Sequence, residues 1–287
     1  MTYAVEQYWN ADMFKQRVEG AGKLIGFPPA APIFEMELYQ ELLEKGIKEK
    51  KSSDPTILVM GMTVAVRQVA HSLSRRVTCI DISQGAIEVL GPAIPSEQNE
   101  KLLYKNWFEL PSVLNQPLPD VIVGDGIFCT MQSITESRKL LQHIKNTVSY
   151  DGAVVLRVML YPEEFKQNPL SSSEILRRYR TGAFDAEEFR FAMRLWGFTD
   201  VAYDDTEKML NCGVAFEACK KMVSTGDMSD IEYEEMNKTY YTGKNFVPTQ
   251  KEWEILLTEQ GFQFEVRFLT GKHWFQYFPL YYLRVAN

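Results

Sequence analysis

Two carboxylates and one glycine lie at the ends of apolar runs, where their chemistry could serve a ligand. The run Thr56 to Met60 is typical of a strand buried on both faces of a parallel sheet, and Gly61 follows it where the backbone must turn sharply. Asp81 ends a second apolar run twenty positions later, the spacing at which an acid meets a ribose diol. Asp125 follows a third run, 119–123. The pattern indicates an adenosine-type ligand.

Each acidic residue also has a structural interpretation. A carboxylate that ends a buried strand is costly unless a ligand or a helix N-terminus satisfies it, and this applies to Asp81. Asp125 either contacts an amino group of a cofactor or serves a turn. Among the histidines, His71 and His143 lie in predicted helices, which favours structural or solvent-facing roles. His273 lies in a predicted turn and is the remaining candidate for a general base.

A parallel sheet is needed to bring these residues to one edge, and the order of the apolar runs predicts one. Apolar residues at helical spacing over 66–73 separate the first two strands, and a capping box at Ser133 to Glu136 begins a later helix. The remaining predicted strands are a weak third over 101–104, a fourth over 119–123 and a fifth over 153–159. Strands that alternate with helices predict an α/β fold.

The end of the chain predicts a different pairing. A second capping box, Thr249 to Glu252, begins a last helix, and two apolar runs follow over 262–269 and 278–285. These runs are separated by too few residues for a crossover helix, so they must pair as an antiparallel hairpin at the sheet edge.

The segment 161–248 has a looser pattern and many aromatic residues, and we interpret it as an inserted cap. A helix is predicted from Asp185 through Trp196, 213–219 could be a strand or a buried helix turn, and 225–235 is acidic and expected to be exposed. The predicted organisation is an N-terminal helical extension and possible lid (1–53), a cofactor-binding core (54–160), the substrate cap (161–248) and the last helix and hairpin that complete the sheet (249–287).

Composition narrows the function classes. The chain has 287 residues, of which 45% are hydrophobic, which is enough for a full core. Its formal net charge of -7 does not supply the positive field that nucleic acids require. No window approaches the length of an apolar membrane span, and the first ten residues lack the pattern of a secretory leader, so we expect a cytoplasmic protein. Four scattered cysteines with no CxxC motif predict no metal site.

Taken together, the elements resemble the class I S-adenosylmethionine-dependent methyltransferases over 56–287, with the insert excepted. Four motifs carry the resemblance: 57–63 (first strand and turn), 80–83 (acidic strand end), 105–111 (adenine-side loop) and 120–126 (fourth strand). It implies a Rossmann-like seven-stranded, mostly parallel sheet with a C-terminal antiparallel hairpin and helices on both faces. The implied cofactor is S-adenosylmethionine, and the implied cofactor-binding residues are Gly61, Met62, Asp81, Ile82, Asn106, Trp107, Asp125 and Gly126.

Two positions depart from the family's pattern. The first turn holds a single glycine, Gly61, so the methionine carboxylate of the cofactor needs other donors. Arg67 or Arg17 could bind it in a bidentate manner, or either could be a surface arginine. Asn106 stands where the family often has an acid, and its amide can both donate to and accept from an adenine edge. Trp107 either flanks adenine or belongs to the core.

The predicted reaction is methyl transfer to an oxygen, nitrogen or carbon atom of a small-molecule acceptor. The sulfonium is already activated, so alignment of the acceptor supplies much of the rate and no base is required in advance. Tyr161, Glu163 and Glu164 are the polar candidates nearest the expected pocket, but the catalytic residue is unknown. The aromatic cap suits a planar or apolar acceptor.

Two other functions remain open. One is a non-catalytic member of the fold that binds the cofactor or a nucleoside and acts through a protein partner. The other is a dinucleotide oxidoreductase, which the absence of G-x-G-x-x-G after the first strand disfavours. A homodimer is a possible assembly.

Overall fold

The computed structural model describes residues 33–114, 117–238 and 243–286, and these form two compact units. Unit 1 contains the described residues up to 128, together with 135–159 and those from 253 onward. Unit 2 contains 129–134 and 160–252.

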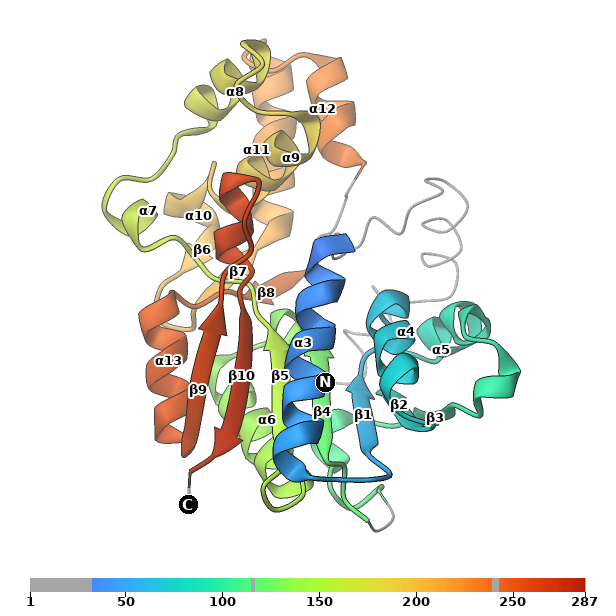
Figure 1. The fold of residues 1–287 in the computed structure, drawn as a ribbon. Coiled ribbons are helices and arrows are strands. Elements are labelled where there is room, and N and C mark those ends of the chain that lie inside the picture. Colours follow the sequence, from blue (N-terminus) through green and yellow to red (C-terminus); the bar gives the residue numbers. More distant parts are fainter. Residues whose placement is uncertain (1–32, 115–116, 239–242, 287) are drawn as a thin grey trace. The chain divides into compact units, whose positions relative to one another are not determined.

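Unit 1 is built on a seven-stranded sheet of order β3-β2-β1-β4-β5-β10-β9 (Figure 1). The strands are β1 (Thr56–Met60), β2 (Arg76–Asp81), β3 (Lys101–Tyr104), β4 (Val121–Asp125), β5 (Ala153–Arg157), β9 (Phe262–Arg267) and β10 (Leu280–Val285). β1 to β5 pair in parallel, and β10 is antiparallel to both β5 and β9. The predicted seven-stranded sheet and its C-terminal hairpin are therefore confirmed.

The strands that carry the acidic residues lie in the interior of the sheet. All five residues of β5 are buried, as are four of the five in each of β1 and β4. Met60 is in register with Ile80 on one side and with Gly124 on the other. Because the strands are parallel and in this register, the residues that follow them meet at one edge.

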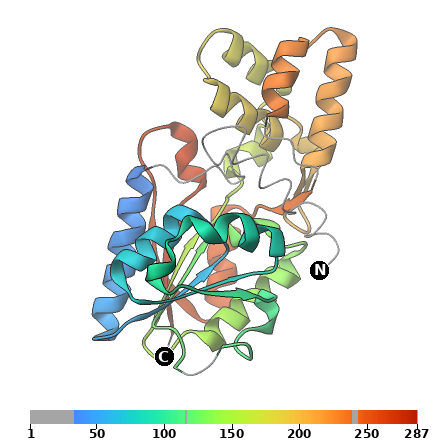
Figure 2. The same ribbon diagram turned by 90° about the vertical axis from the view of Figure 1, so that its right-hand side faces the viewer.

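Helices cover both faces of this sheet (Figure 2). They are α3 (Ile33–Lys50), α4 (Val64–Leu73), α5 (Gln84–Leu90), α6 (Ile134–Thr147) and α13 (Gln250–Glu259). α3 packs very closely against the face that carries Tyr282, because a Cβ added to Gly46 would lie 2.9 Å from Ala153 Cβ. On the other face, Trp253 of α13 makes an edge contact with Tyr281 at a ring distance of 6.3 Å.

The connections contain short 3-10 helices. These are η1 (Gly91–Ala93), η2 (Ser96–Gln98), η3 (Trp107–Glu109), η4 (Ile127–Thr130) and η5 (His273–Tyr277).

The helix α13 has the cap that the sequence predicts. Thr249 Oγ1 accepts from Glu252 N at 3.3 Å, and Glu252 Oε2 accepts from Thr249 N at 2.9 Å. This reciprocal pair is the capping box that the sequence predicts for α13.

Unit 2 combines helices with a small antiparallel sheet of order β6-β7-β8. Its elements are α7 (Glu163–Gln167), α8 (Ser172–Arg180), α9 (Ala186–Leu195), α10 (Thr199–Ala202), β6 (Tyr203–Asp204), β7 (Met209–Asn211), α11 (Cys212–Thr225), α12 (Asp230–Asn237) and β8 (Lys244–Phe246). The segment left open between strand and helix turn, 213–219, lies inside α11. The acidic segment 225–235 is not uniformly exposed, because most of it forms α12, in which Glu232 is buried.

The predicted insert, 161–248, begins and ends at neighbouring positions within unit 2. Tyr161 N donates to Pro248 O at 2.8 Å, and Tyr161 forms an isolated parallel bridge with Thr249. The interior of the unit is aromatic, with Phe189 and Trp196 buried and Tyr179 stacked on Phe189 at a ring distance of 4.2 Å. A segment whose ends lie side by side is arranged as an insertion.

The described part of the N-terminal extension is α3, which packs on the sheet of unit 1. Residues 1–32, which complete the predicted extension, lie outside the described residues. Among the described helices, none combines the length and the apolar character needed to span a bilayer.

Candidate functional site

The first turn of the site depends on the backbone angle of Gly61. Its φ of +96° lies in the region that side chains disfavour, while a Cβ there would meet only Ile127 Cγ2 at 3.9 Å. A glycine is thus required at position 61 because of its positive φ, and not because a Cβ would lack space. Its N–H donates to Ile80 O at 2.9 Å, which ties the turn to β2, and Met62 beyond it is buried.

Asp81 ends β2 with its carboxylate partly satisfied by the backbone. Its Oδ1 accepts from Ser83 N at 2.7 Å, and its side chain is neither fully buried nor exposed. Removal from water raises the pKa of Asp81 to about 7, and the backbone N–H groups of Ser83 and Ile82 act in the opposite direction. A carboxylate with this pKa would be stabilised in its charged form by further hydrogen-bond donors.

The loop 105–111, which we predicted to lie beside adenine, is hydrogen-bonded to β2 near its end. Trp107 is buried, and its indole Nε1 donates to Ile80 O at 2.9 Å. Asn106 caps η3, because its side chain accepts from Phe108 N at 3.0 Å while Glu109 Oε1 accepts from Asn106 N at 3.0 Å. The Asn106 oxygen therefore already accepts one hydrogen bond, whereas its amide N–H groups have no partner among the described residues.

Asp125 is held by two neighbours, neither of which the sequence identified. Its Oδ1 accepts from Arg157 Nε at 2.5 Å and from the Tyr39 hydroxyl at 3.1 Å, and its side chain is 6% exposed. Arg157 is opposite Asp125 in the sheet register, and its backbone oxygen accepts from Gly126 N at 3.1 Å. The sequence did offer one signal for Arg157, because it is a cation at the end of an otherwise apolar strand.

A second carboxylate shares the same guanidinium. Arg157 Nη1 lies 3.3 Å from Glu35 Oε2, and Glu35, Tyr39 and Arg157 are all at most 2% exposed. Burial raises the pKa of Glu35 to about 7, against the lowering effect of Arg157 and with a further increase from Asp125. Burial alone would lower the pKa of Arg157, but the carboxylates of Asp125 and Glu35 raise it. We call these four residues the Asp125 cluster.

Arg67 does not have either of the roles that the sequence suggested. It is completely buried and donates to Leu90 O at 2.7 Å and to Gly91 O at 3.1 Å. It also forms an ion pair with Glu100, whose Oε1 lies 3.2 Å from His71 Nε2. Arg67 is thus neither a surface residue nor available to a ligand carboxylate. The alternative donor, Arg17, lies outside the described residues.

The other candidate polar residues have structural partners or cannot be placed. The Tyr161 hydroxyl lies 2.5 Å from Thr199 Oγ1, and burial raises the pKa of Tyr161 to about 12, so it is a poor base at neutral pH. His143 Nδ1 lies 2.5 Å from Leu110 O. The His273 side chain lies outside the described part of the structure. Glu163 and Glu164 are in the first turn of α7 in unit 2.

The described residues contain no group of three or more His, Cys, Asp or Glu side chains that could hold a metal ion. The four cysteines are free and buried.

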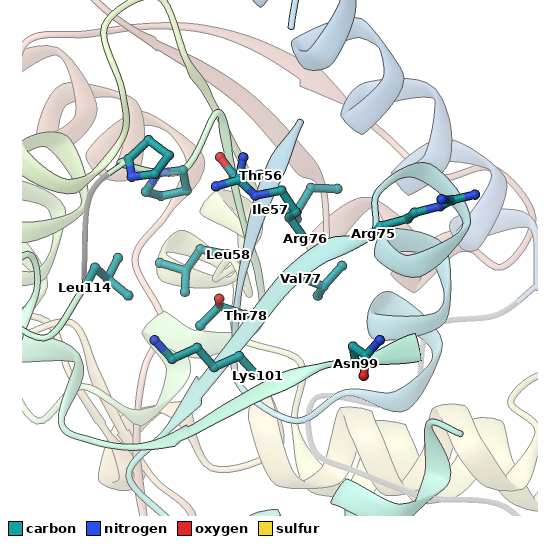
Figure 3. Close-up of a pocket in the computed structure, with 12 residues that line it drawn as sticks. Thr56, Ile57, Leu58, Arg75, Arg76, Val77, Thr78, Asn99, Lys101 and Leu114 are labelled. Carbon is teal, nitrogen blue, oxygen red and sulfur yellow. The ribbon is translucent and has the colours of Figure 1, made fainter. Parts of the chain in front are cut away.

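A cleft of about 320 Å³ lies at the opposite edge of the sheet, where β1, β2 and β3 begin (Figure 3). Its lining includes Thr56, Thr78 and Lys101 on these three strands and Leu114 on the connection from β3 to β4. The described part of that connection contains the short 3-10 helix η3 and no longer helix, so no long helix from it covers the cleft. Arg76 at the cleft pairs with the exposed Asp54 at 3.0 Å. None of the predicted cofactor residues lines this cleft.

Comparison with known proteins finds similarity in structure and not in sequence. No protein-family model matches the chain, and no curated protein matches it in sequence. Magnesium protoporphyrin IX methyltransferase from Synechocystis PCC 6803 with bound S-adenosylhomocysteine matches with a TM-score of 0.55 at 9% identity, over 99% of each chain.

Two further solved structures give a similar result. N-methyltransferase NodS from Bradyrhizobium japonicum WM9 in complex with S-adenosylhomocysteine has a TM-score of 0.51 at 11% identity, over 96% of this chain and 98% of that chain. The CcbJ methyltransferase from Streptomyces caelestis has a TM-score of 0.51 at 9% identity, over 87% and 89%. At these identities the similarity concerns the fold.

Proposed function

We propose that this chain, which has the class I methyltransferase fold, binds S-adenosylmethionine at the carboxyl edge of its sheet and transfers the methyl group to a small molecule. The observation that carries the proposal is the convergence of the Gly61 turn, the Asp81 carboxylate and Asp125 on three adjacent strands in register. Two of the solved structures with this fold contain S-adenosylhomocysteine, the product form of that cofactor.

In this proposal Asp81 accepts hydrogen bonds from the two ribose hydroxyl groups. These donors favour the ionised carboxylate, so binding would lower a pKa that burial has raised to about 7. Asn106 would donate to the adenine edge through its amide hydrogens, because its oxygen caps η3. Trp107 offers only its ring to adenine, since its N–H is bound to Ile80.

The methionine carboxylate needs donors, and the N-terminus of α4 can provide them in place of Arg67. Thr63, the N-cap residue, makes no side-chain capping bond, and the helix begins at Val64. The first backbone N–H groups of a helix have no partner within the helix and carry partial positive charge. Gly61 and Met62 lead directly into this helix end, whereas Ile82 and Gly126 would contact the cofactor from the ends of β2 and β4.

The chemistry that the bound cofactor supplies is a methyl group on a positively charged sulfur. The chain's own contribution is alignment of the acceptor and exclusion of water, which can supply much of the rate without a dedicated base. We propose that the aromatic segment 161–248, which belongs to unit 2, binds a planar or apolar acceptor whose methylated atom is oxygen, nitrogen or carbon. No catalytic residue is assigned.

The net charge of -7 supports a small molecule over a nucleic acid as the acceptor. A cytoplasmic location and a homodimer stay predictions from the sequence.

Isothermal titration calorimetry with S-adenosylmethionine and S-adenosylhomocysteine tests the cofactor, using wild type, Asp81→Asn and Asp54→Asn. Two hydrogen bonds to a charged acceptor are together worth about 3 kcal/mol, so we expect Asp81→Asn to weaken binding about 100-fold. Asp54 is an exposed aspartate in a surface ion pair, and its variant should bind like wild type. Equal affinity of all three proteins would refute the role of Asp81, and no binding by wild type would refute the proposal.

A second function is favoured by the single glycine of the first turn, which is fewer than active members of the resembling family carry. Under this alternative the chain binds the cofactor or a nucleoside without turnover and acts through a protein partner. Micromolar binding together with no methyl transfer to any acceptor in a broad small-molecule panel would favour it.

A further inference from the structure

The Asp125 cluster contains more negative than positive charge. Asp125 from β4 and Glu35 from α3 both lie against the single guanidinium of Arg157 from β5. The remaining described groups that face it are neutral: the Tyr39 hydroxyl and the ring of Phe278, which lies 5.8 Å from Arg157 Cζ. α4 also packs against α3, but its buried cation, Arg67, is paired with Glu100. With both carboxylates ionised, the cluster has a net charge of minus one.

Among the described residues, no group donates a hydrogen bond to one oxygen of each carboxylate. Glu35 Oε1 is buried and accepts no hydrogen bond from the described residues. Both of the bonds to Asp125 end on Oδ1, which leaves Oδ2 without a described donor. The lack of a donor is costly for the buried Glu35 Oε1, and in native structures a buried oxygen of this kind calls for an explanation. The cluster therefore lacks both a positive charge and a donor.

Resting on the function proposed above, we propose that Asp125 Oδ2 accepts the primary ammonium of the cofactor's methionine part and that Glu35 releases a proton when this ammonium binds. Asp125 contacts the ligand directly. Glu35 is a positioning residue that acts through Arg157, because it is fully buried. Tyr39 and Arg157 hold Asp125 Oδ1 so that the other oxygen is presented to the ligand.

The choice of ammonium over sulfonium follows from hydrogen bonding. An ammonium carries three N–H donors, whereas a sulfonium carries a positive charge and no donor. The cluster lacks a hydrogen-bond donor as well as a positive charge, and of the two groups the ammonium alone supplies both. S-adenosylhomocysteine retains the ammonium and has lost the sulfonium charge, which makes it the suitable probe.

Binding of the ammonium would move one proton, from Glu35 to the solvent. Before binding, Glu35 and Asp125 compete for Arg157, and Glu35 holds a proton for part of the time at neutral pH. When the ammonium neutralises Asp125, the guanidinium charge becomes available to Glu35 and favours its carboxylate. The Glu35 proton passes to the solvent buffer, and no other bond is formed or broken.

The test is calorimetry of S-adenosylhomocysteine and of methylthioadenosine, repeated at pH 7 in buffers of different ionisation enthalpy, which counts the protons released. Methylthioadenosine keeps the adenosine and lacks the amino-acid part, so any proton released from Asp81 is common to both ligands. Because a group with a pKa near 7 is half protonated at pH 7, we expect S-adenosylhomocysteine to release about half a proton more than methylthioadenosine. This excess should approach about one proton at pH 6.

Glu35→Gln should abolish the excess while S-adenosylhomocysteine still binds, and Glu41→Gln, on an exposed position of the same helix, should leave it unchanged. The ligand's own ammonium adds no released proton, because a neighbouring carboxylate favours its charged form. An excess that survives in Glu35→Gln, or equal proton release for both ligands in wild type, overturns the inference while the proposed cofactor stands. If wild type binds neither ligand, the proposed function fails and the inference fails with it.

Discussion

At the scale of single residues, two carboxylates have the same raised pKa for different reasons. Burial raises the pKa of Asp81 to about 7, and in the described part of the chain its donors are the backbone N–H groups of Ser83 and Ile82. Glu35 reaches about 7 even though a guanidinium lies 3.3 Å away, because burial is stronger and Asp125 competes for the same cation. A ligand donor would relieve Asp81 directly and Glu35 indirectly.

The raised pKa of Glu35 has a consequence for stability. The folded-state pKa of about 7 lies above the unfolded value of 4.5, so between these pH values the folded chain binds the proton more tightly. This contribution to the free energy of unfolding is complete below the unfolded pKa and is lost as the pH rises through 7. From pH 5 to pH 8 wild type should therefore lose on the order of 2 to 3 kcal/mol relative to Glu35→Gln.

Urea unfolding of both proteins at pH 5 and pH 8 measures this difference, with Glu41→Gln as the control that should follow wild type. A wild-type free energy that changes with pH in parallel with Glu35→Gln would show that Glu35 keeps an ordinary pKa.

Arg67 and Arg157 show how far residue type alone can be interpreted. Arg67 was a candidate ligand because it follows the first turn, yet it lies under α5 and binds the carbonyl groups at the end of that helix. Arg157 ends an otherwise apolar strand, yet it contacts both carboxylates of the Asp125 cluster. An arginine near a site in sequence can point away from it, because the helix or strand direction decides where its side chain goes.

At the scale of elements, the β1 to α4 turn works with one glycine because only one residue has a positive φ. Gly61 takes that angle, and the residues after it enter α4 directly. The short turn leaves the uncapped helix N-terminus next to the strand end. We infer that this helix end compensates for the missing glycines.

Gly61→Ala tests the turn, and Gly182→Ala is a matched control. Both glycines have positive φ, at +96° and +73°, and both have open space for a Cβ, but Gly182 lies in unit 2. Left-handed geometry costs an alanine about 1–2 kcal/mol, so both variants should lose about that much stability. Only Gly61→Ala should weaken S-adenosylhomocysteine binding. If the strained turn must keep its conformation for the ligand to bind, the same cost lowers the affinity by about tenfold or more.

Chemical denaturation and calorimetry on the two variants give both quantities. Unchanged affinity in a destabilised Gly61→Ala variant would show that the ligand does not depend on this turn.

At the scale of the whole molecule, all eight predicted cofactor residues lie in unit 1, between positions 61 and 126. The chain leaves that unit for unit 2 and returns at neighbouring positions, as the Tyr161 N to Pro248 O bond of 2.8 Å shows. We therefore predict that excision of 162–247 separates cofactor binding from recognition of the acceptor.

Replacing 162–247 by a short glycine-serine linker should leave unit 1 folded and able to bind S-adenosylhomocysteine within about tenfold of wild type, a free-energy change of about 1.4 kcal/mol or less. Circular dichroism and cooperative unfolding would first establish that the shortened chain is folded. A folded but non-binding product would mean that unit 2 contributes to the cofactor site. The result would also decide whether 161–248 is a cap in the functional sense.

The sequence by itself predicted a mostly parallel sheet of alternating strands and helices and the closing hairpin, whereas the strand order came from the structure. It could do so because strand and helix periodicities and capping residues are local properties, and because alternating elements leave few ways to build a parallel sheet. It also identified Asp81 and Asp125 as strand-end carboxylates, since β2 and β4 end at them.

Only the tertiary structure decided what each of those side chains contacts. Glu35 and Tyr39 precede Asp125 by 90 and 86 positions, and Arg157 follows it by 32, so no local pattern joins them. They meet because α3 packs on the sheet while Asp125 and Arg157 stand opposite each other in register. Burial and partner choice set the charge of the cluster, and both are properties of packing that the order of residues along the chain does not contain.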